Sequence, residues 1–161
     1  MLVKEAAKLD AEQVLNTYWD GNFPVDVNGI AKKMGVEVFD SILASDISGY
    51  IVKRPGEPAE IHVATDHVPT RKRFTVAHEL GHFVERTTRA GDDDFGYVEK
   101  RGGKRTLQEF YADEFAGHVL MPQKDVDKMG REGKKPFEMA KAFGVSLDAM
   151  MVRLRRLHAD A

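Results

Sequence analysis

The sequence predicts an α+β domain, a small antiparallel or mixed sheet of about three strands packed on helices, with a helical C-terminal tail. Short β-branched runs cluster between residues 36 and 65, and apolar residues recur at helical spacing on both sides of them. The 161 residues suffice for one domain with at most a small appendage. We therefore expect a domain at 1–122 and a helical extension at 123–161 that packs on it.

Two helices are expected before the strands. The first begins at Asp10, which with Gln13 resembles a capping box, and it ends near Gly21. The second spans residues 27–34, with Asp26 as its N-cap. Both are interpreted as packing elements.

Three strands follow, at residues 36–39, 49–52 and 60–65. The turn at 54–58 contains two prolines and a glycine, and it joins the last two strands into a hairpin. An edge strand of such a sheet can hold an extended peptide by β-augmentation.

A long helix is expected at residues 71–86, with Thr70 as a candidate N-cap. Residues 87–105 are polar and glycine-rich, so we expect a long loop there, with some ordered structure around 95–98. Helical pattern returns at 106–120, where Thr106 and Glu109 match a capping box.

The tail is expected to hold three short helices, at 124–129, 136–143 and 147–157. The last two resemble a helix-turn-helix, and the final helix carries several arginines. The start of that helix, Leu147-Asp-Ala-Met150, offers little for reading base edges. We therefore expect packing on the domain and no direct contact with DNA.

Composition narrows the classes of function. The net charge is −2, which favours neither nucleic acid nor a membrane as partner. No apolar run approaches the ~18 residues of a membrane span, and the first residues lack the apolar region of a signal peptide. There are no cysteines. We expect a cytoplasmic protein whose metal sites use only His, Asp or Glu.

The sequence His78-Glu79-Leu80-Gly81-His82 is an H-E-x-x-H motif. On a helix, residues at i and i+4 share a face, so both imidazoles can meet one zinc ion at ~2.0–2.1 Å. Glu79 then takes the position of a general base. The alternative is a structural helix with two incidental histidines. The apolar periodicity, and a glycine at 81 where something must approach closely, favour the metal site.

A catalytic zinc site needs a third protein ligand. The residues after His82 do not continue as in metzincins, which leaves a glutamate from a later helix. Glu109-Phe-Tyr-Ala-Asp113 gives E-x-x-x-D, as in thermolysin-like sites. Glu109 would bind the metal, although capping alone also explains it, and Asp113 would accept a hydrogen bond from a ligand histidine, His78 being favoured.

These residues resemble the ImmA/IrrE family of metallopeptidases. The resemblance rests on Arg71-Lys-Arg-Phe-Thr-Val-Ala-His-Glu-Leu-Gly-His82 and on Glu109-Phe-Tyr-Ala-Asp-Glu-Phe-Ala-Gly-His-Val-Leu-Met-Pro122, and it extends from about residue 10 to 157. It implies a compact zincin-like fold. It also implies cleavage or derepression of a helix-turn-helix repressor, often encoded by a phage or mobile element, under stress or DNA damage.

The expected activity is that of an endopeptidase with about one zinc ion per chain. The donor for the oxyanion stays open among Tyr97, Tyr50 and Tyr111, with His118 a weaker candidate. The alternative function is a regulatory or antitoxin-like module that binds a transcription factor without cutting it.

Overall fold

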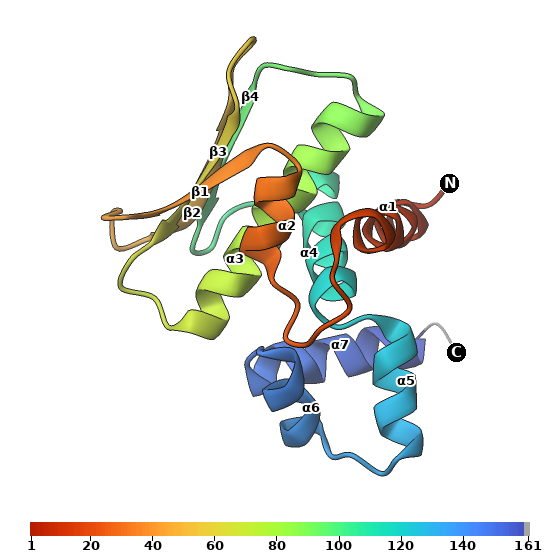
Figure 1. Cartoon of the computed structure of the whole chain (residues 1–161). Coiled ribbons are helices and arrows are strands. Elements are labelled where there is room, and N and C mark those ends of the chain that lie inside the picture. Colours follow the sequence, from red (N-terminus) through yellow and green to blue (C-terminus); the bar gives the residue numbers. More distant parts are fainter. Residues whose placement is uncertain (160–161) are drawn as a thin grey trace.

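A four-stranded sheet lies on one side of two long central helices, and three short helices close one end of the molecule (Figure 1). The structure is a computed structural model that describes residues 1–159. Its elements are α1 (Val3–Tyr18), α2 (Val27–Lys33), β1 (Val36–Ser41), β2 (Ile47–Lys53), β3 (Ala59–Ala64), α3 (Pro69–Val84), η1 (Glu85–Arg89, a π-helical turn), β4 (Phe95–Lys100), α4 (Leu107–Leu120), α5 (Gln123–Arg131), α6 (Pro136–Phe143) and α7 (Leu147–Ala159).

The sheet has the order β1-β3-β2-β4. β1 runs parallel to β3, whereas β2 is antiparallel to both β3 and β4. The α+β prediction and the β2–β3 hairpin are confirmed. The ordered structure expected around 95–98, within the long loop predicted at 87–105, is an edge strand, Phe95–Lys100. Aspartates and glycines around this segment concealed its alternation of half-buried and exposed residues.

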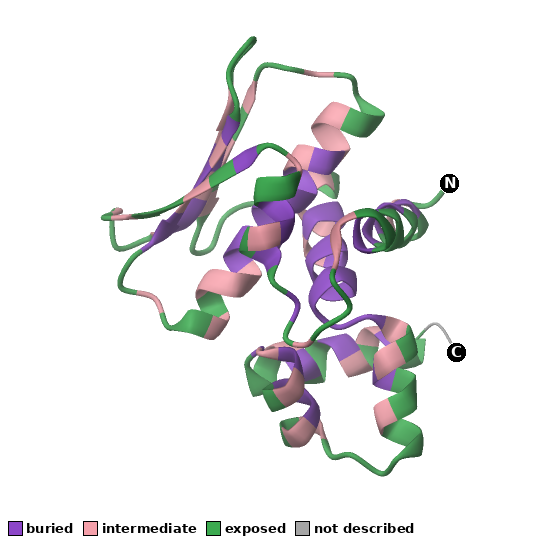
Figure 2. Ribbon diagram, in the orientation of Figure 1, coloured by how far each residue is buried: buried purple, intermediate pink, exposed green. Residues whose placement is uncertain are grey.

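The core lies between the sheet and helices α3 and α4, which are buried along most of their length (Figure 2). Ile51 and Ile61 on the inner face of the sheet and Leu80 on α3 are almost fully buried. At Gly81 the two central helices approach so closely that an added Cβ would lie 3.0 Å from Ala112 Cα. This close approach brings the residues of α3 and α4 that surround Gly81 within reach of one another.

Two of the expected helix caps form. The carboxylate of Asp26 accepts a hydrogen bond from the Gly29 amide at 3.0 Å, and the Thr106 hydroxyl accepts one from the Glu109 amide at 3.1 Å. The cap expected at Thr70 is wrong. α3 begins after Val68 with a proline at its first position, which needs no amide partner.

The cap expected at Asp10 is also wrong, because α1 begins at Val3 and Asp10 lies in its middle. The side chain is buried and accepts hydrogen bonds from Arg89 at 2.6 and 3.0 Å and from the Tyr111 hydroxyl. Asp10 therefore ties α1 to η1 and α4, through partners that lie far away in the sequence.

Two arginines of α7 contact α4 and the residue that follows it. Arg153 is buried and donates to the Met121 carbonyl at 3.0 Å, and Arg156 donates to the buried Glu114 carboxylate at 2.9 Å. Arg73 on α3 donates to the carbonyl groups of residues 143 and 144.

The division of the chain at residue 122 stays a prediction. Among residues 1–159, no helix is long and apolar enough to cross a membrane.

Candidate metal centre

Helix α3 presents the imidazoles of His78 and His82 side by side, with ring centroids 4.9 Å apart. Both side chains are buried. Glu109 on α4 reaches both of them. Its Oε2 lies 2.9 Å from Nε2 of His78, and its Oε1 lies 3.0 Å from Nε2 of His82. The Glu109 amide donates to the Thr106 cap, as the amide of any residue could, whereas its carboxylate lies against the two histidines.

Asp113, one turn after Glu109 on α4, holds the opposite side of His78. Nδ1 of His78 donates to Asp113 Oδ1 at 2.8 Å, which directs Nε2 toward the centre of the site. The other Asp113 oxygen lies 2.8 Å from Arg105. Burial alone would raise the pKa of Asp113, but His78 and Arg105 hold it below its usual value. The carboxylate is thus kept charged.

Glu79 has no hydrogen-bond partner for either carboxylate oxygen among the described residues, although it is fully buried. Burial raises its pKa to about 8, against the opposing influence of His78. Both ring nitrogens of His82 also lack a hydrogen bond within the described chain. Buried polar atoms left without partners are costly, and one such atom from each of Glu79 and His82 lies in a cluster that could hold a metal ion.

The spacing of these atoms fits a bound cation. Around a tetrahedral ion with bonds of ~2.0–2.1 Å, neighbouring ligand atoms stand roughly 3.3 Å apart. His82 Nε2 and Glu109 Oε1 lie 3.0 Å apart, yet His82 Nε2 makes no hydrogen bond to any residue that the structure describes. A nitrogen and an oxygen that lie this close without hydrogen-bond geometry are typical of two ligands of one metal. Two imidazoles and a carboxylate are a donor set that suits zinc.

Strand β4 covers both histidines from the sheet side. The ring of Tyr97 stacks on the ring of His82, with centroids 4.1 Å apart and planes at 4°. Oε2 of Glu99 lies 2.8 Å from Nε2 of His78. The ligating atoms of His78, Glu79, His82 and Glu99 lie within 4.8 Å of one another. Glu99 was not among the site residues predicted from the sequence, and its only signal there is its place two residues after Tyr97, on the same face of a strand.

Burial alone would lower the pKa of His78, but Asp113, Glu109 and Glu99 raise it well above its usual value. Burial alone would likewise raise the pKa of Glu109, and the two histidines depress it. Several carboxylates are therefore gathered around the two imidazoles. Such a site attracts a positive charge, either protons or a metal cation.

The structure does not bring all the predicted tyrosines to the centre. Tyr50 stacks on His62, with centroids 4.6 Å apart, on the opposite face of the sheet. Tyr111 donates its hydroxyl to Asp10 inside the core. His118 lies 2.9 Å from Arg153 beside α7. Of the four candidates for the oxyanion donor, Tyr97 is the one whose ring touches a candidate ligand.

The model of the IrrE N-terminal-like peptidase domain matches residues 31–155, more than three quarters of the chain. The chain belongs to this family. The match includes every residue of the centre described above, so the resemblance found in the sequence is confirmed.

A solved structure extends this family assignment to the fold. The chain is similar to a "Mycobacterium tuberculosis transcriptional regulator", with a TM-score of 0.62 and 20% sequence identity over 94% of this chain. The chain spans 46% of the length of that regulator. No protein in a search of curated proteins matches significantly.

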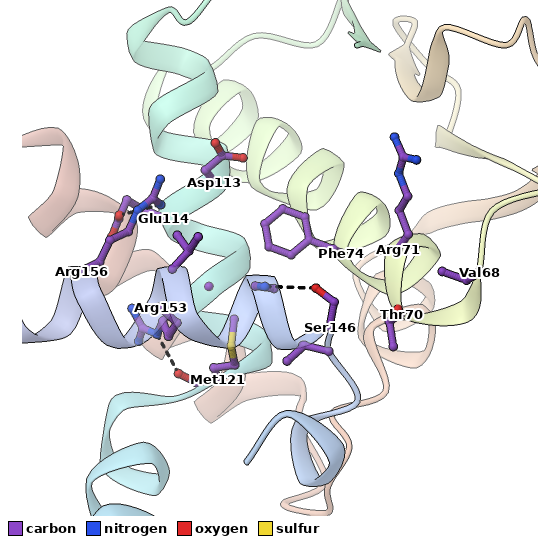
Figure 3. Close-up of a pocket in the computed structure, with 14 residues that line it drawn as sticks. Val68, Thr70, Arg71, Phe74, Asp113, Glu114, Met121, Ser146, Arg153 and Arg156 are labelled. Atoms are coloured by element: carbon purple, nitrogen blue, oxygen red, sulfur yellow. Dashed lines mark hydrogen bonds and ion pairs between the residues drawn. The ribbon is translucent and has the colours of Figure 1, made fainter. Parts of the chain in front are cut away.

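A cavity of about 430 Å³ lies beside the centre of this IrrE-like domain (Figure 3). It is lined by residues of α3, α4 and α7, among them Phe74, Met121 and Val152. Asp113 is the lining residue that also contacts a candidate ligand, namely His78. α7 therefore forms one wall of a mainly apolar space next to the metal centre.

Proposed function

We propose that this protein is a zinc-dependent endopeptidase that cleaves or inactivates a regulatory protein, with a helix-turn-helix repressor as the leading substrate. One observation carries the proposal. The carboxylate of Glu79 is fully buried, with no hydrogen-bond partner among residues 1–159, beside two imidazoles and Glu109, which converge from two different helices. Membership of a peptidase family supports the same chemistry.

The metal would be held by His78, His82 and Glu109. When bound there, zinc would supply a Lewis acid that polarises a carbonyl group and lowers the pKa of water. Asp113 fixes the tautomer of His78 through the bond to Nδ1, so that Nε2 presents its lone pair to the ion. The carboxylate of Glu109 would bind the same ion beside Nε2 of His82, 3.0 Å away.

Glu79 acts as the general base and acid. Its buried carboxylate has a raised pKa, which suits a group that accepts a proton from water and then delivers it to the leaving amine. Tyr97 is our candidate for the oxyanion donor. Burial raises the pKa of its phenol, so this group keeps its proton for donation.

The substrate would bind along β4. This strand pairs only with β2 in the described sheet, so its other edge is open to an extended peptide. A peptide paired there would run beside the two histidines that Tyr97 and Glu99 touch. Main-chain hydrogen bonds would hold it regardless of its side chains, and neighbouring surfaces would supply the specificity.

The test compares wild type with Glu79→Gln, using Glu12→Gln on the exposed face of α1 as a matched control. Each protein is loaded with zinc, its metal content is measured, and it is incubated with helix-turn-helix repressors, beginning with any encoded beside its own gene. We expect about one zinc ion per chain in all three. Cleavage should fall at least ~10²-fold in Glu79→Gln alone.

An active Glu79→Gln protein would remove the assignment of the base. Wild type that binds a repressor and leaves it intact, while carrying zinc, would instead support the regulatory module that acts without cutting. Wild type that takes up no zinc would remove the hydrolytic mechanism altogether.

A further inference from the structure

Glu99 is the one side chain at the centre that the proposed mechanism does not use. It comes from β4, whereas the other carboxylates and both imidazoles come from α3 and α4. Its Oε2 lies 2.8 Å from Nε2 of His78, the atom that also lies 2.9 Å from Glu109. Two carboxylates from different elements thus meet at the lone pair that His78 would give to a metal.

The local structure of the sheet aims Glu99 at this point. Phe95, Tyr97 and Glu99 alternate along one half-buried face of β4, while Gly96 and Val98 face outward. The ring of Tyr97 lies flat on the ring of His82. Glu99, the next residue on the same face of the strand, therefore lies beside His78.

A bulge in β2 supports this placement. The pairing of β2 with β4 shifts register between Ile47 and Gly49, which sets Ser48 opposite the step from Glu99 to Lys100. The buried Ser48 hydroxyl accepts a hydrogen bond from Arg71 on α3 at 3.1 Å. Bulges beside functional sites commonly redirect a side chain, and this one is tied to the metal-site helix itself.

The charge of the site and the number of its ligands both support Glu99 as a ligand of the metal. A divalent cation held by two neutral imidazoles is balanced by two carboxylates, and Glu109 and Glu99 supply two. A metal with three protein ligands keeps a position open for chemistry, whereas one with four is closed. Glu79, fully buried and without a hydrogen-bond partner in the described chain, stays free for proton transfer.

We propose that Glu99 is a fourth protein ligand, which closes the metal centre in the resting protein and whose side chain swings away when a substrate enters, while β4 stays in place. This rests on the metal centre of the proposed function and adds to it a means of holding the enzyme inactive. Glu99 is only partly buried, with 32% of its side chain exposed. Its side chain can swing outward while Phe95 and Tyr97, on the same face of β4, stay packed against the core.

Cobalt as the probe tests this closure without any substrate. The full chain is loaded with Co²⁺, whose visible spectrum reports the number and type of ligands, and azide is then titrated as a small competing anion. The variants are Glu99→Gln, Glu99→Ala and Glu109→Ala. Glu37→Gln is the matched control, since this exposed glutamate lies on the opposite edge strand, β1.

We expect the spectrum of Glu99→Gln to differ from that of wild type, and azide to bind the variant at a concentration at least ~10-fold lower. Glu99→Ala should bind zinc at least ~10-fold more weakly than wild type in competition with a chelator. Glu37→Gln should behave as wild type in both measurements.

The failures are distinguishable. If both Glu99 variants keep the wild-type spectrum, azide response and zinc affinity while Glu109→Ala loses the metal, the closure is wrong and the proposed function stands. If wild type itself binds neither cobalt nor zinc, the proposed function falls, and the closure falls with it.

Discussion

Replacing Gly81 by alanine tests the contact on which the metal centre depends. This glycine lies between His78 and His82 on α3, at a position where α4 passes close by. An added Cβ would lie 3.0 Å from Ala112 Cα and 3.2 Å from Phe115 Cβ and Cδ1. Carbon atoms prefer a separation of ~3.5–4.0 Å, so the two helices would have to move apart by roughly 0.5 Å.

Two opposing effects set the size of the change. Alanine is favoured over glycine in a helix interior by ~1 kcal/mol. Overpacking a tight contact costs about 1–3 kcal/mol, because backbone atoms of α4 cannot turn aside as a flexible side chain can. We expect Gly81→Ala to lower the free energy of unfolding by about 1 kcal/mol. Zinc affinity should fall with it, since metal sites tolerate ligand displacements of only ~0.2 Å.

Gly130 provides the matched control, because it lies in α5 and nothing would lie within 4 Å of its added Cβ. Gly130→Ala should raise the free energy of unfolding by up to ~1 kcal/mol. Urea unfolding of the metal-free proteins measures both changes. A Gly81→Ala protein that gains as much stability as Gly130→Ala would refute the close approach of the two helices.

Three further predictions concern carboxylates and their partners. Asp113→Ala should weaken zinc binding about 10–100-fold, measured against a chelator, because His78 loses the acceptor that orients it. Asp10→Ala should lower the free energy of unfolding by about 2 kcal/mol, whereas the exposed Glu12→Ala should change it by under ~0.5 kcal/mol in urea unfolding. Burial and Asp10 raise the pKa of Tyr111, so the stability it contributes is complete below about pH 10 and is lost as pH rises toward the folded pKa. Unfolding at graded alkaline pH should therefore show a steeper fall above pH ~10 for wild type than for Tyr111→Phe.

The sequence was most informative where the structure depends on spacing within one helix. His78 and His82 share a face because they are four residues apart, and the same spacing puts Glu109 and Asp113 on one face of α4. The meeting of the two helices could be anticipated only from the chemistry, which requires a third ligand. The glycine between the histidines supplied a physical hint, which the close approach of α4 explains.

Asp10 shows why local patterns fail elsewhere. Its position before an apolar-periodic stretch matches that of an N-cap, and no nearby residue contradicts this interpretation. The partners that explain it, Arg89 and Tyr111, come 79 and 101 residues later. A buried carboxylate in mid-helix is tolerated only with such partners, and nothing in a short window of sequence reveals them.

Strand β4 presents the same difficulty with a larger consequence for function. Its pairing with β2 crosses more than forty residues of chain, and its sequence alternates between half-buried and exposed positions without a strong apolar signal. Once it is placed, the strand has two roles that depend on each other. Its free edge is where a peptide would pair, and its inner face carries the carboxylate that we propose closes the metal centre. A peptide that pairs with β4 would lie beside the Glu99 side chain, so binding of a substrate and displacement of this carboxylate from the metal would become one event.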